Sequence, residues 1–416
     1  MNKRKESLLE LLLPLRNFGN WLIVGVTIGA IGGILGAVFH LCIDKVTELR
    51  AENPWIIALL PLGGVLIALL YHVSKVKISA NEIISAVRSG QKLPFMTLPV
   101  IFSSTVITQL VGGSAGKEGA AIQMGGTIGY EVGGFFHLDE KDRHVAVMCG
   151  LASVFAAVFG TPITAAVFAL EVVSVGEMCY AALIPCIPAV LVAGHMAELF
   201  SVAPLHFTLS VPELDPGNLA GVALLAVLCA FVSILFCLGL HKGSSAAKKL
   251  MKNAYLRAAA GGILLIGMTL LSGGTEYNGA GFNLVNNAMA GKMEWYAFAV
   301  KMLFTVVTVS CGFKGGEIVP TMAIGAALGC SVAKMLGMDP EFFAAIGLLS
   351  LFCGMVNCPM ASVMMGVELF GGEGLVFYAA ACMVSYTLSG KYSLYSSQKL
   401  LYAKTRAELV NERTEK

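Results

Sequence analysis

One acidic residue, Glu118, stands in an otherwise apolar part of the chain, between residues 99–111 and residues 119–128. A charged side chain at the centre of a bilayer costs about 2.5–3.5 kcal/mol on insertion scales, so an ionisable residue in these surroundings indicates a functional site. The segment 112–119 reads GGSAGKEG, and its glycines let the backbone turn and approach a ligand closely. We predict that Glu118 is the central ionisable group of a site for a small anion.

The residues after Glu118 are small and apolar, and we expect them to open a helix. A helix N-terminus presents unpaired N–H groups and the positive end of the helix dipole, and it therefore binds anions. The expected anion contacts are Gly116, Lys117 and Gly119. The carboxylate of Glu118 would occupy the anion site when ionised and leave it when protonated. The alternative is an acid at a helix start that pairs with Lys117.

A second glycine-rich break, GGEIVP at residues 315–320, also precedes an apolar run. Pro320 suits the first turn of a helix. The pattern predicts a second helix N-terminus aimed at the same region, with Ile318 and Val319 as anion contacts. Glu317 is either a second proton-handling group or only an acid at the helix start.

Three further polar residues follow apolar runs. Glu171 and Glu368 end two helices that each contain a proline, and their symmetry favours a structural role in bonding backbone N–H groups. Tyr395 follows the last apolar run. It is either an aromatic side chain at the membrane interface or a hydroxyl donor to an anion.

The elements that must hold these residues are membrane helices. The chain has 416 residues, of which 56% are hydrophobic and only 13% charged, whereas a soluble domain has about 25% charged residues. A spanning helix needs about 20 apolar residues, and runs of about 10–14 indicate re-entrant or buried pieces. The chain contains both kinds, in residues 20–41, 55–73, 217–240, 258–271 and 376–388. We predict an all-α polytopic membrane protein with helices of unequal length, several of them re-entrant.

The remaining composition excludes several kinds of site. The eleven cysteines show no Cys-x-x-Cys spacing and the seven histidines form no cluster with them, so we expect no metal, no cofactor and no disulfide framework. A net charge of +2 does not suggest a nucleic-acid partner. The basic, leucine-rich N-terminus suits an interfacial amphipathic helix, and its positive charge places this end in the cytoplasm.

The two halves of the chain resemble each other. A shift of 199 residues superposes Gly113, Gly116 and Glu118 on Gly312, Gly315 and Glu317. A shift of 197 superposes Gly150, Leu151, Ser153, Phe155, Pro162 and Glu171 on Gly347, Leu348, Ser350, Phe352, Pro359 and Glu368. Duplicated membrane halves are typical of transporters, whose sites lie at mid-membrane between the repeats.

Three polar or glycine-rich breaks, at residues 203–217, 241–253 and 272–282, read as loops. We divide the chain into an N-terminal interfacial helix (1–18), a first membrane repeat (19–203), a linker (204–216), a second membrane repeat (217–404) and a short cytoplasmic tail (405–416).

These motifs resemble the CLC family of chloride channels and proton-coupled anion exchangers, over residues 23–401. Residues 116–120 are similar to the family's G-(K/R)-E-G-P segment, with alanine in place of proline, and residues 316–320 to its G-x-F-x-P segment. Residues 159–162 and Tyr395 resemble two further signatures. The resemblance implies an inverted repeat of about eighteen helices in a homodimer with one pore per subunit. It also implies that Glu118 is a gating glutamate that alternates with anions and carries protons.

Three departures from the family pattern concern the anion and proton paths. The family's G-S-G-I-P segment is replaced by ISANEI at residues 78–83, so the central serine becomes Ile78, or Ser79 after a one-residue slip, with Asn81 close by. The phenylalanine of G-x-F-x-P becomes Ile318. The internal proton-transfer glutamate of typical exchangers becomes Val172.

Together these departures resemble the fluoride-specific bacterial clade, whose members exchange fluoride for protons. The resemblance implies fluoride export across a bacterial inner membrane, with both termini cytoplasmic and with fluoride, protons and lipid as the partners. The alternative is a chloride-selective antiporter or a passive anion channel of the same fold. An intramembrane peptidase with Ser114 as nucleophile is a third interpretation, for which the sequence offers no well-placed base beyond His195.

Overall fold

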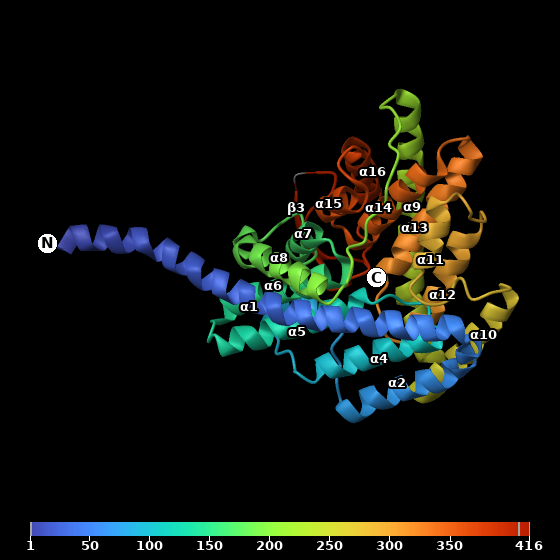
Figure 1. The fold of residues 1–416 in the computed structure, drawn as a ribbon, viewed down its shortest axis with the longest axis horizontal. Helices are drawn as coiled ribbons and strands as arrows, with labels where there is room; N and C mark the ends of the chain where they lie inside the picture. Colours follow the sequence, from blue (N-terminus) through green and yellow to red (C-terminus); the bar gives the residue numbers. More distant parts are fainter. Residues whose placement is uncertain (1, 407, 416) are drawn as a thin grey trace.

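The computed structural model describes residues 2–406 and 408–415, with side chains from residue 14 onward. This part of the chain is almost entirely helical, and the first half packs against the second (Figure 1). Its α-helices are α1 (Asn2–Glu52), α2 (Leu60–Ser74), α3 (Ala80–Ser89), α4 (Thr97–Val111), α5 (Glu118–Phe135), α6 (Glu140–Phe159), α7 (Pro162–Glu171), α8 (Leu183–Leu199), α9 (Pro216–Leu250), α10 (Ala254–Leu271), α11 (Phe282–Met289), α12 (Ala297–Cys311), α13 (Ile318–Leu336), α14 (Pro340–Val356), α15 (Pro359–Phe370) and α16 (Leu375–Leu388). Two 3₁₀ helices, Pro54–Leu59 and Tyr180–Ala182, complete the helical elements of the described residues. The predicted all-α architecture of about eighteen helices of unequal length is confirmed.

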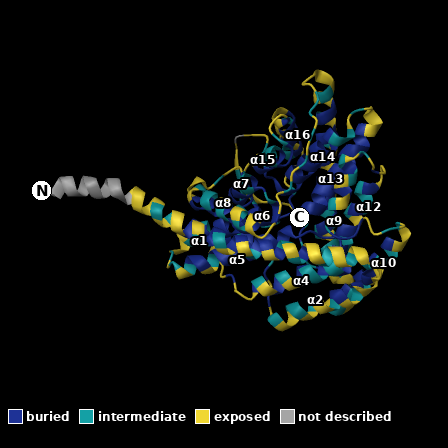
Figure 2. Ribbon diagram, in the orientation of Figure 1, coloured by how far each residue is buried: buried dark blue, intermediate teal, exposed yellow. Residues whose placement is uncertain are grey.

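The helices divide by length as the apolar runs predicted. Seven helical segments of the described chain are long and apolar enough to cross a membrane, and several others have only 10–17 residues. Apolar side chains such as Ile23, Leu62 and Ile263 point outward. In Figure 2 the outer helices carry exposed residues while α13 and α14 are buried inside. An outward apolar surface around a buried centre is the pattern of a protein that lies in lipid.

One predicted loop is wrong. Residues 241–253 were expected to break the chain, but α9 continues to Leu250, and only residues 251–253 are non-helical. The segment contains alanines and lysines, which are strong helix formers, and no proline. The loops predicted at 203–217 and 272–282 are confirmed over most of their length.

The repeat is confirmed, but its first register is wrong by one residue. Helices α4 and α12 cover residues 97–111 and 297–311, a shift of 200. Both end at a glycine in the left-handed region, Gly112 with φ 86° and Gly312 with φ 106°. The residue preceding each following helix is Lys117 in one half and Glu317 in the other. Glu317 therefore takes the place of Lys117 and is not the counterpart of Glu118.

The second register, 197, is confirmed. Helix α6 has 20 residues, whereas its counterpart α14 has 17. The difference in number between equivalent residues of the two repeats is therefore 200 before these helices and 197 after them. The two helices end at residues in the left-handed region, Gly160 and Asn357, with the same difference in number.

Glu171 and Glu368, at the ends of α7 and α15, each bind backbone N–H groups of the other repeat. Glu368 accepts hydrogen bonds from the backbone N–H groups of Ile163, at 2.9 Å, and Thr164, at 2.7 Å, at the start of α7. Glu171 accepts from Met360 and Ala361, at 3.1 and 2.9 Å, at the start of α15. The predicted role in bonding backbone N–H groups is confirmed. Because the contact is reciprocal, it indicates a twofold relation between the halves.

Replacing Glu368 with Gln is expected to lower the stability of the fold by about 1–2 kcal/mol, because the amide keeps one acceptor but loses the charge that strengthens both bonds. The melting temperature of the detergent-solubilised protein measures this. Glu373→Gln, on the exposed turn after α15, is the matched control. Equal melting temperatures for the two variants would contradict the capping role.

The segment after α16 forms a small sheet that was not predicted. Strand β2 (Lys399–Tyr402) pairs in parallel with β1 (Ser174–Val175), which follows α7, and antiparallel with β3 (Leu409–Arg413). The sheet therefore joins the C-terminal segment to the residues after α7 in the first repeat.

Candidate functional site

The two glycine-rich breaks meet face to face. The N–H of Gly116 donates to the carbonyl of Gly316 at 2.6 Å, and the N–H of Gly316 donates to the carbonyl of Gly116 at 2.8 Å. This pair of bonds holds the N-termini of α5 and α13 against each other. The approach is so close that a Cβ atom on Gly119 would lie 2.7 Å from the carbonyl oxygen of Gly315. The predicted convergence of two helix N-termini is thus present.

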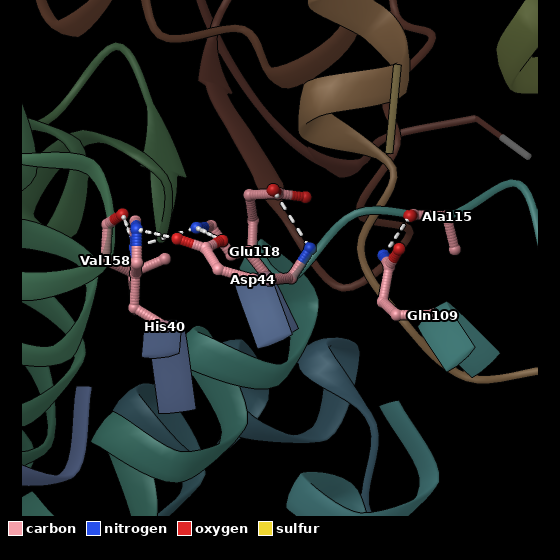
Figure 3. Close-up of polar contacts among 7 residues, drawn as sticks. His40, Asp44, Gln109, Ala115, Glu118 and Val158 are labelled. Carbon is pink, nitrogen blue, oxygen red and sulfur yellow. Dashed lines mark hydrogen bonds and ion pairs between the residues drawn. The ribbon is translucent and has the colours of Figure 1, made fainter. Parts of the chain in front are cut away.

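Glu118 is completely buried, and its side chain folds back over the junction. Its Oε1 accepts a hydrogen bond from the backbone N–H of Lys117 at 3.0 Å, and its Oε2 has no hydrogen-bond partner among the residues that the structure describes (Figure 3). A Cβ atom on Gly116 would overlap the carboxyl group, and one on Gly316 would lie 2.5 Å from Oε2. The carboxylate therefore fills a space that only glycines leave open, beside two positive helix ends.

A cavity of about 560 Å³ lies on one side of this junction. The predicted site residues that line it are Ile78, Ser79, Asn81, Gly119, Glu317 and Tyr395. Lys248, Arg257 and Lys314 also line it. Three cationic side chains against one carboxylate give the cavity a positive lining, which favours anions. We call it the inner cavity.

Ile78, Ser79 and Asn81, from the segment that replaces the family's serine segment, line the inner cavity as expected, but the Ser79 hydroxyl already forms a hydrogen bond. Ser79 precedes α3 and forms a capping box with Glu82, to which its Oγ donates. Asn81 uses its Oδ1 to accept from the backbone N–H of Ser397 at 3.1 Å. Ile78 contributes only an apolar side chain. Asn81 lines the inner cavity, and its amide nitrogen, which carries two donor protons, takes no part in the contact with Ser397.

A smaller hollow of about 100 Å³ is lined by Lys117, Arg50 and Asp44 among others. Glu118 lines neither hollow, whereas its neighbour Lys117 lines this one and its neighbour Gly119 lines the inner cavity. We call it the outer hollow. The carboxylate of Glu118 thus lies between residues that line two different openings. Of the other predicted anion contacts, Lys117 lines the outer hollow, whereas Gly116, Ile318 and Val319 line neither opening.

The ammonium of Lys117 belongs to a short polar chain. It lies 2.8 Å from Nδ1 of His40 and 3.9 Å from Asp44, and His40 Nε2 lies 2.9 Å from the other oxygen of Asp44 (Figure 3). The pairing of Lys117 with Glu118 that the sequence left open is therefore a backbone contact, while the ammonium pairs with α1.

A buried cation holds the segment before α5. Lys301, on α12, is fully buried and donates to Ser114 Oγ at 2.9 Å and to the carbonyls of Tyr277 and Gly279 at 3.0 and 2.8 Å. Ser114 Oγ also lies 3.0 Å from Thr305 Oγ1, and Ser114 is completely buried. His195, the base that the sequence offered, is exposed on α8. A serine enclosed in this way is not open to the peptide bond that the peptidase interpretation requires.

Sequence reasoning missed several residues of this site. His40 and Lys301 are single polar residues inside apolar runs, and that signal was available. Gln398 and Thr414, which contact the loop of Tyr395, lie in a polar stretch without such a signal. Their importance is visible only in the folded chain.

Comparisons with known proteins agree with this fold. The family model described as voltage gated chloride channel matches residues 77–390. A chloride/fluoride channel protein of Pseudomonas syringae pv. tomato is 34% identical over 402 residues, which cover 94% of this chain and 89% of the relative. An H(+)/Cl(-) exchange transporter ClcA of Vibrio vulnificus is 24% identical and covers 85% of this chain and 83% of its own. The solved structure of a CLC-type fluoride/proton antiporter superposes with a TM-score of 0.87 at 28% identity, over 91% of this chain and 98% of that chain.

Proposed function

This chain belongs to the voltage-gated chloride channel (CLC) family, and from that premise we propose that it exchanges fluoride for protons across a cell membrane and so exports fluoride. The observation that carries the proposal is the carboxylate of Glu118. It is buried, one of its oxygens has no partner in the described part of the chain, and it lies at the meeting point of two helix N-termini, between two openings. A carboxylate in an anion-binding position can be replaced there by an anion once it is protonated.

Fluoride suits the polar groups of this junction. Fluoride is smaller and more strongly hydrated than chloride, so its site must supply close, strong donors. The N-termini of α5 and α13 supply backbone N–H groups, and the hydroxyl of Ser79, which only a one-residue slip would place at the family's central serine, donates to Glu82. The likeness to a relative described as a chloride/fluoride channel protein and to a fluoride/proton antiporter also supports fluoride.

Reconstituted vesicles test the proposal directly. A fluoride gradient imposed across the membrane should drive protons against their own gradient, and a chloride gradient of equal size should drive far fewer. A fluoride electrode and a pH-sensitive dye follow the two fluxes. Chloride flux equal to fluoride flux would favour a chloride-selective exchanger, and fluoride flux without proton movement would favour a passive channel.

We assign the inner part of the proton path to Glu317. Val172 stands where typical exchangers carry an internal glutamate, and it cannot bind a proton. Glu317 precedes α13 and lines the inner cavity, within reach of solvent on that side of Glu118.

Replacing Glu317 with Gln is expected to reduce the number of protons moved per fluoride by at least about 10-fold, since the removal of a proton-transferring group typically costs about 10²–10⁴ in rate. Fluoride flux down its gradient should fall less, because the backbone donors remain. The ratio of the two initial fluxes measures this. A Glu317→Gln protein with wild-type coupling would exclude Glu317 from the path.

We also propose the homodimer of the family, with one pathway in each subunit. The basic N-terminal segment supports a position in which this end faces the cytoplasm of a bacterial cell. The even number of crossings that an inverted repeat implies would place both termini there.

A further inference from the structure

The segment that follows Tyr395 folds back on the loop that carries this tyrosine and is hydrogen-bonded to its backbone carbonyl. We call residues 397–415, without the undescribed residue 407, the strap. It comprises β2, β3 and the residues around them, and β2 pairs with β1, which follows α7 in the first repeat. The contacts of three of its side chains indicate what the strap does.

Gln398 is the centre of the strap and is completely buried. Its Nε2 donates to the carbonyls of Val172 and Val356, at 3.1 and 2.9 Å. Its Oε1 accepts from Nδ2 of Asn357 at 3.2 Å and from Oγ of Ser393 at 2.8 Å. A side-chain amide has two donor protons and two acceptor lone pairs, so every bond that Gln398 can make is made. It joins the ends of α7 and α14 to the loop that carries Tyr395.

Thr414 joins the end of the strap to the loop of Tyr395. Its hydroxyl lies 3.0 Å from the carbonyl oxygen of Tyr395 and 3.3 Å from that of Gln398, and its backbone N–H donates to Gln398 at 3.2 Å. Only 5% of Thr414 is exposed, so water does not compete for these bonds.

The strap also reaches the first repeat. The N–H and Oγ of Ser397 both contact Oδ1 of Asn81, at 3.1 and 3.2 Å, and Arg88 donates to the carbonyl of Ser397. Asn81 and Tyr395 line the inner cavity from different repeats. The strap therefore fixes the distance between two walls of that cavity.

A lysine anchors the turn of the strap. Nζ of Lys404 donates to Oδ1 of Asn357 at 2.5 Å, to the carbonyl of Tyr386 at 2.8 Å and to Oγ of Ser389 at 2.9 Å. Burial lowers the pKa of this ammonium to about 8. Its position at the C-terminal ends of α14 and α16 offsets part of that cost, because helix C-termini attract cations.

We propose that Gln398 and Thr414 are positioning residues for the anion pathway, and that the strap sets the place of the Tyr395 side chain in the inner cavity. This rests on the proposed function in one respect, that Tyr395 lies on the pathway. The strap is then a part of the transport machinery and not a free tail. Its hydrogen bonds act on the backbone of Tyr395, and the tyrosine hydroxyl transmits their effect to the anion.

Thr414→Val tests the proposal, because valine keeps the shape of threonine and removes the hydroxyl. In reconstituted vesicles we expect the KM for fluoride to rise about 3- to 10-fold, the loss typical of one buried hydrogen bond, with a smaller change in maximal rate. Thr414→Ser, which keeps the hydroxyl, should restore the wild-type KM. In a Tyr395→Phe background, Thr414→Val should have no further effect on KM, since the group it positions is gone.

Three results would overturn the proposal. They are an unchanged KM in Thr414→Val, a full additional effect of Thr414→Val in the Tyr395→Phe background, and a Tyr395→Phe protein with the wild-type KM. If the wild-type protein moves chloride and not fluoride, the proposed function fails. The same set of variants assayed with chloride then still decides whether the strap positions Tyr395.

Discussion

Replacing Glu118 with Gln is expected to abolish proton movement driven by a fluoride gradient, by at least about 100-fold, the lower range for removing a proton-transferring group. The amide has nearly the same shape, and its oxygen can still accept the hydrogen bond that Lys117 N–H donates at 3.0 Å. The protein should therefore fold normally. The loss comes from chemistry alone, because an amide does not take up a proton at physiological pH. Proton uptake by vesicles under a fixed fluoride gradient measures it.

The matched control is Glu213→Gln, in the exposed linker before α9, which should transport like the wild type. A melting temperature within a few degrees of wild type shows that the Glu118→Gln protein is folded. Proton movement that persists in this variant would remove Glu118 from its proposed role and would favour Glu317 as the sole proton-carrying group.

The helical architecture could be predicted from the sequence because lipid imposes a strict rule on it. Backbone groups without water must bond within helices, so an apolar run such as residues 20–41 has essentially one outcome. The glycine-rich segments 112–119 and 315–320 were also informative, since a charged residue beside glycines in an apolar run has few structural explanations. The types and spacing of these residues were therefore sufficient to predict two helix N-termini that converge.

The register between the repeats could not be predicted to the residue. Glycines are abundant in this chain, and a shift of 199 matches Glu118 to Glu317 by identity alone. The structure shows a shift of 200, at which a lysine in one half replaces a glutamate in the other. Pseudosymmetric positions share a backbone conformation but need not share chemistry. Here the asymmetry puts a cation at the outer hollow and an acid at the inner cavity.

Contacts between side chains far apart in the sequence could not be predicted, for a different reason. His40 and Lys117 are 77 residues apart, and their contact depends on how α1 crosses the start of α5. Gln398 and Thr414 lie in a polar stretch that resembles an ordinary soluble tail. Nothing in a local pattern reveals that such residues are buried, because burial is a property of the assembled fold.

Replacing Gly116 with Ala is expected to uncouple the two fluxes. The three atoms nearest to the added Cβ all belong to the carboxyl group of Glu118, and the φ of Gly116 does not require glycine. Overpacking costs about 1–3 kcal/mol, which lowers the population of the buried carboxylate about 5- to 150-fold. We therefore expect at least about 5-fold fewer protons per fluoride, while fluoride continues to pass. Gly194→Ala on α8, where an added Cβ meets nothing within 4 Å, is the control.

Gly316→Ala should behave differently, although it faces the same carboxylate. Its added Cβ would also meet the backbone nitrogens of Gly119 and Glu118, so the two helix N-termini must separate. We expect a loss of stability of about 3 kcal/mol or more and a loss of both fluxes. A Gly316→Ala protein that is folded and merely uncoupled would mean that the junction is more adaptable than its hydrogen bonds indicate.

A shorter side chain at position 118 tests whether the effect of Gly116→Ala comes from contact with the carboxyl group of Glu118. In a Glu118→Ala protein the atoms that an added Cβ would strike are absent, so Gly116→Ala should then change neither the fluoride flux nor the melting temperature. Two residues that act through one contact give such a non-additive cycle, whereas independent residues give additive losses. An additive result would show that Gly116 is required by the backbone bridge to Gly316, and the competition between carboxylate and anion would need another structural basis.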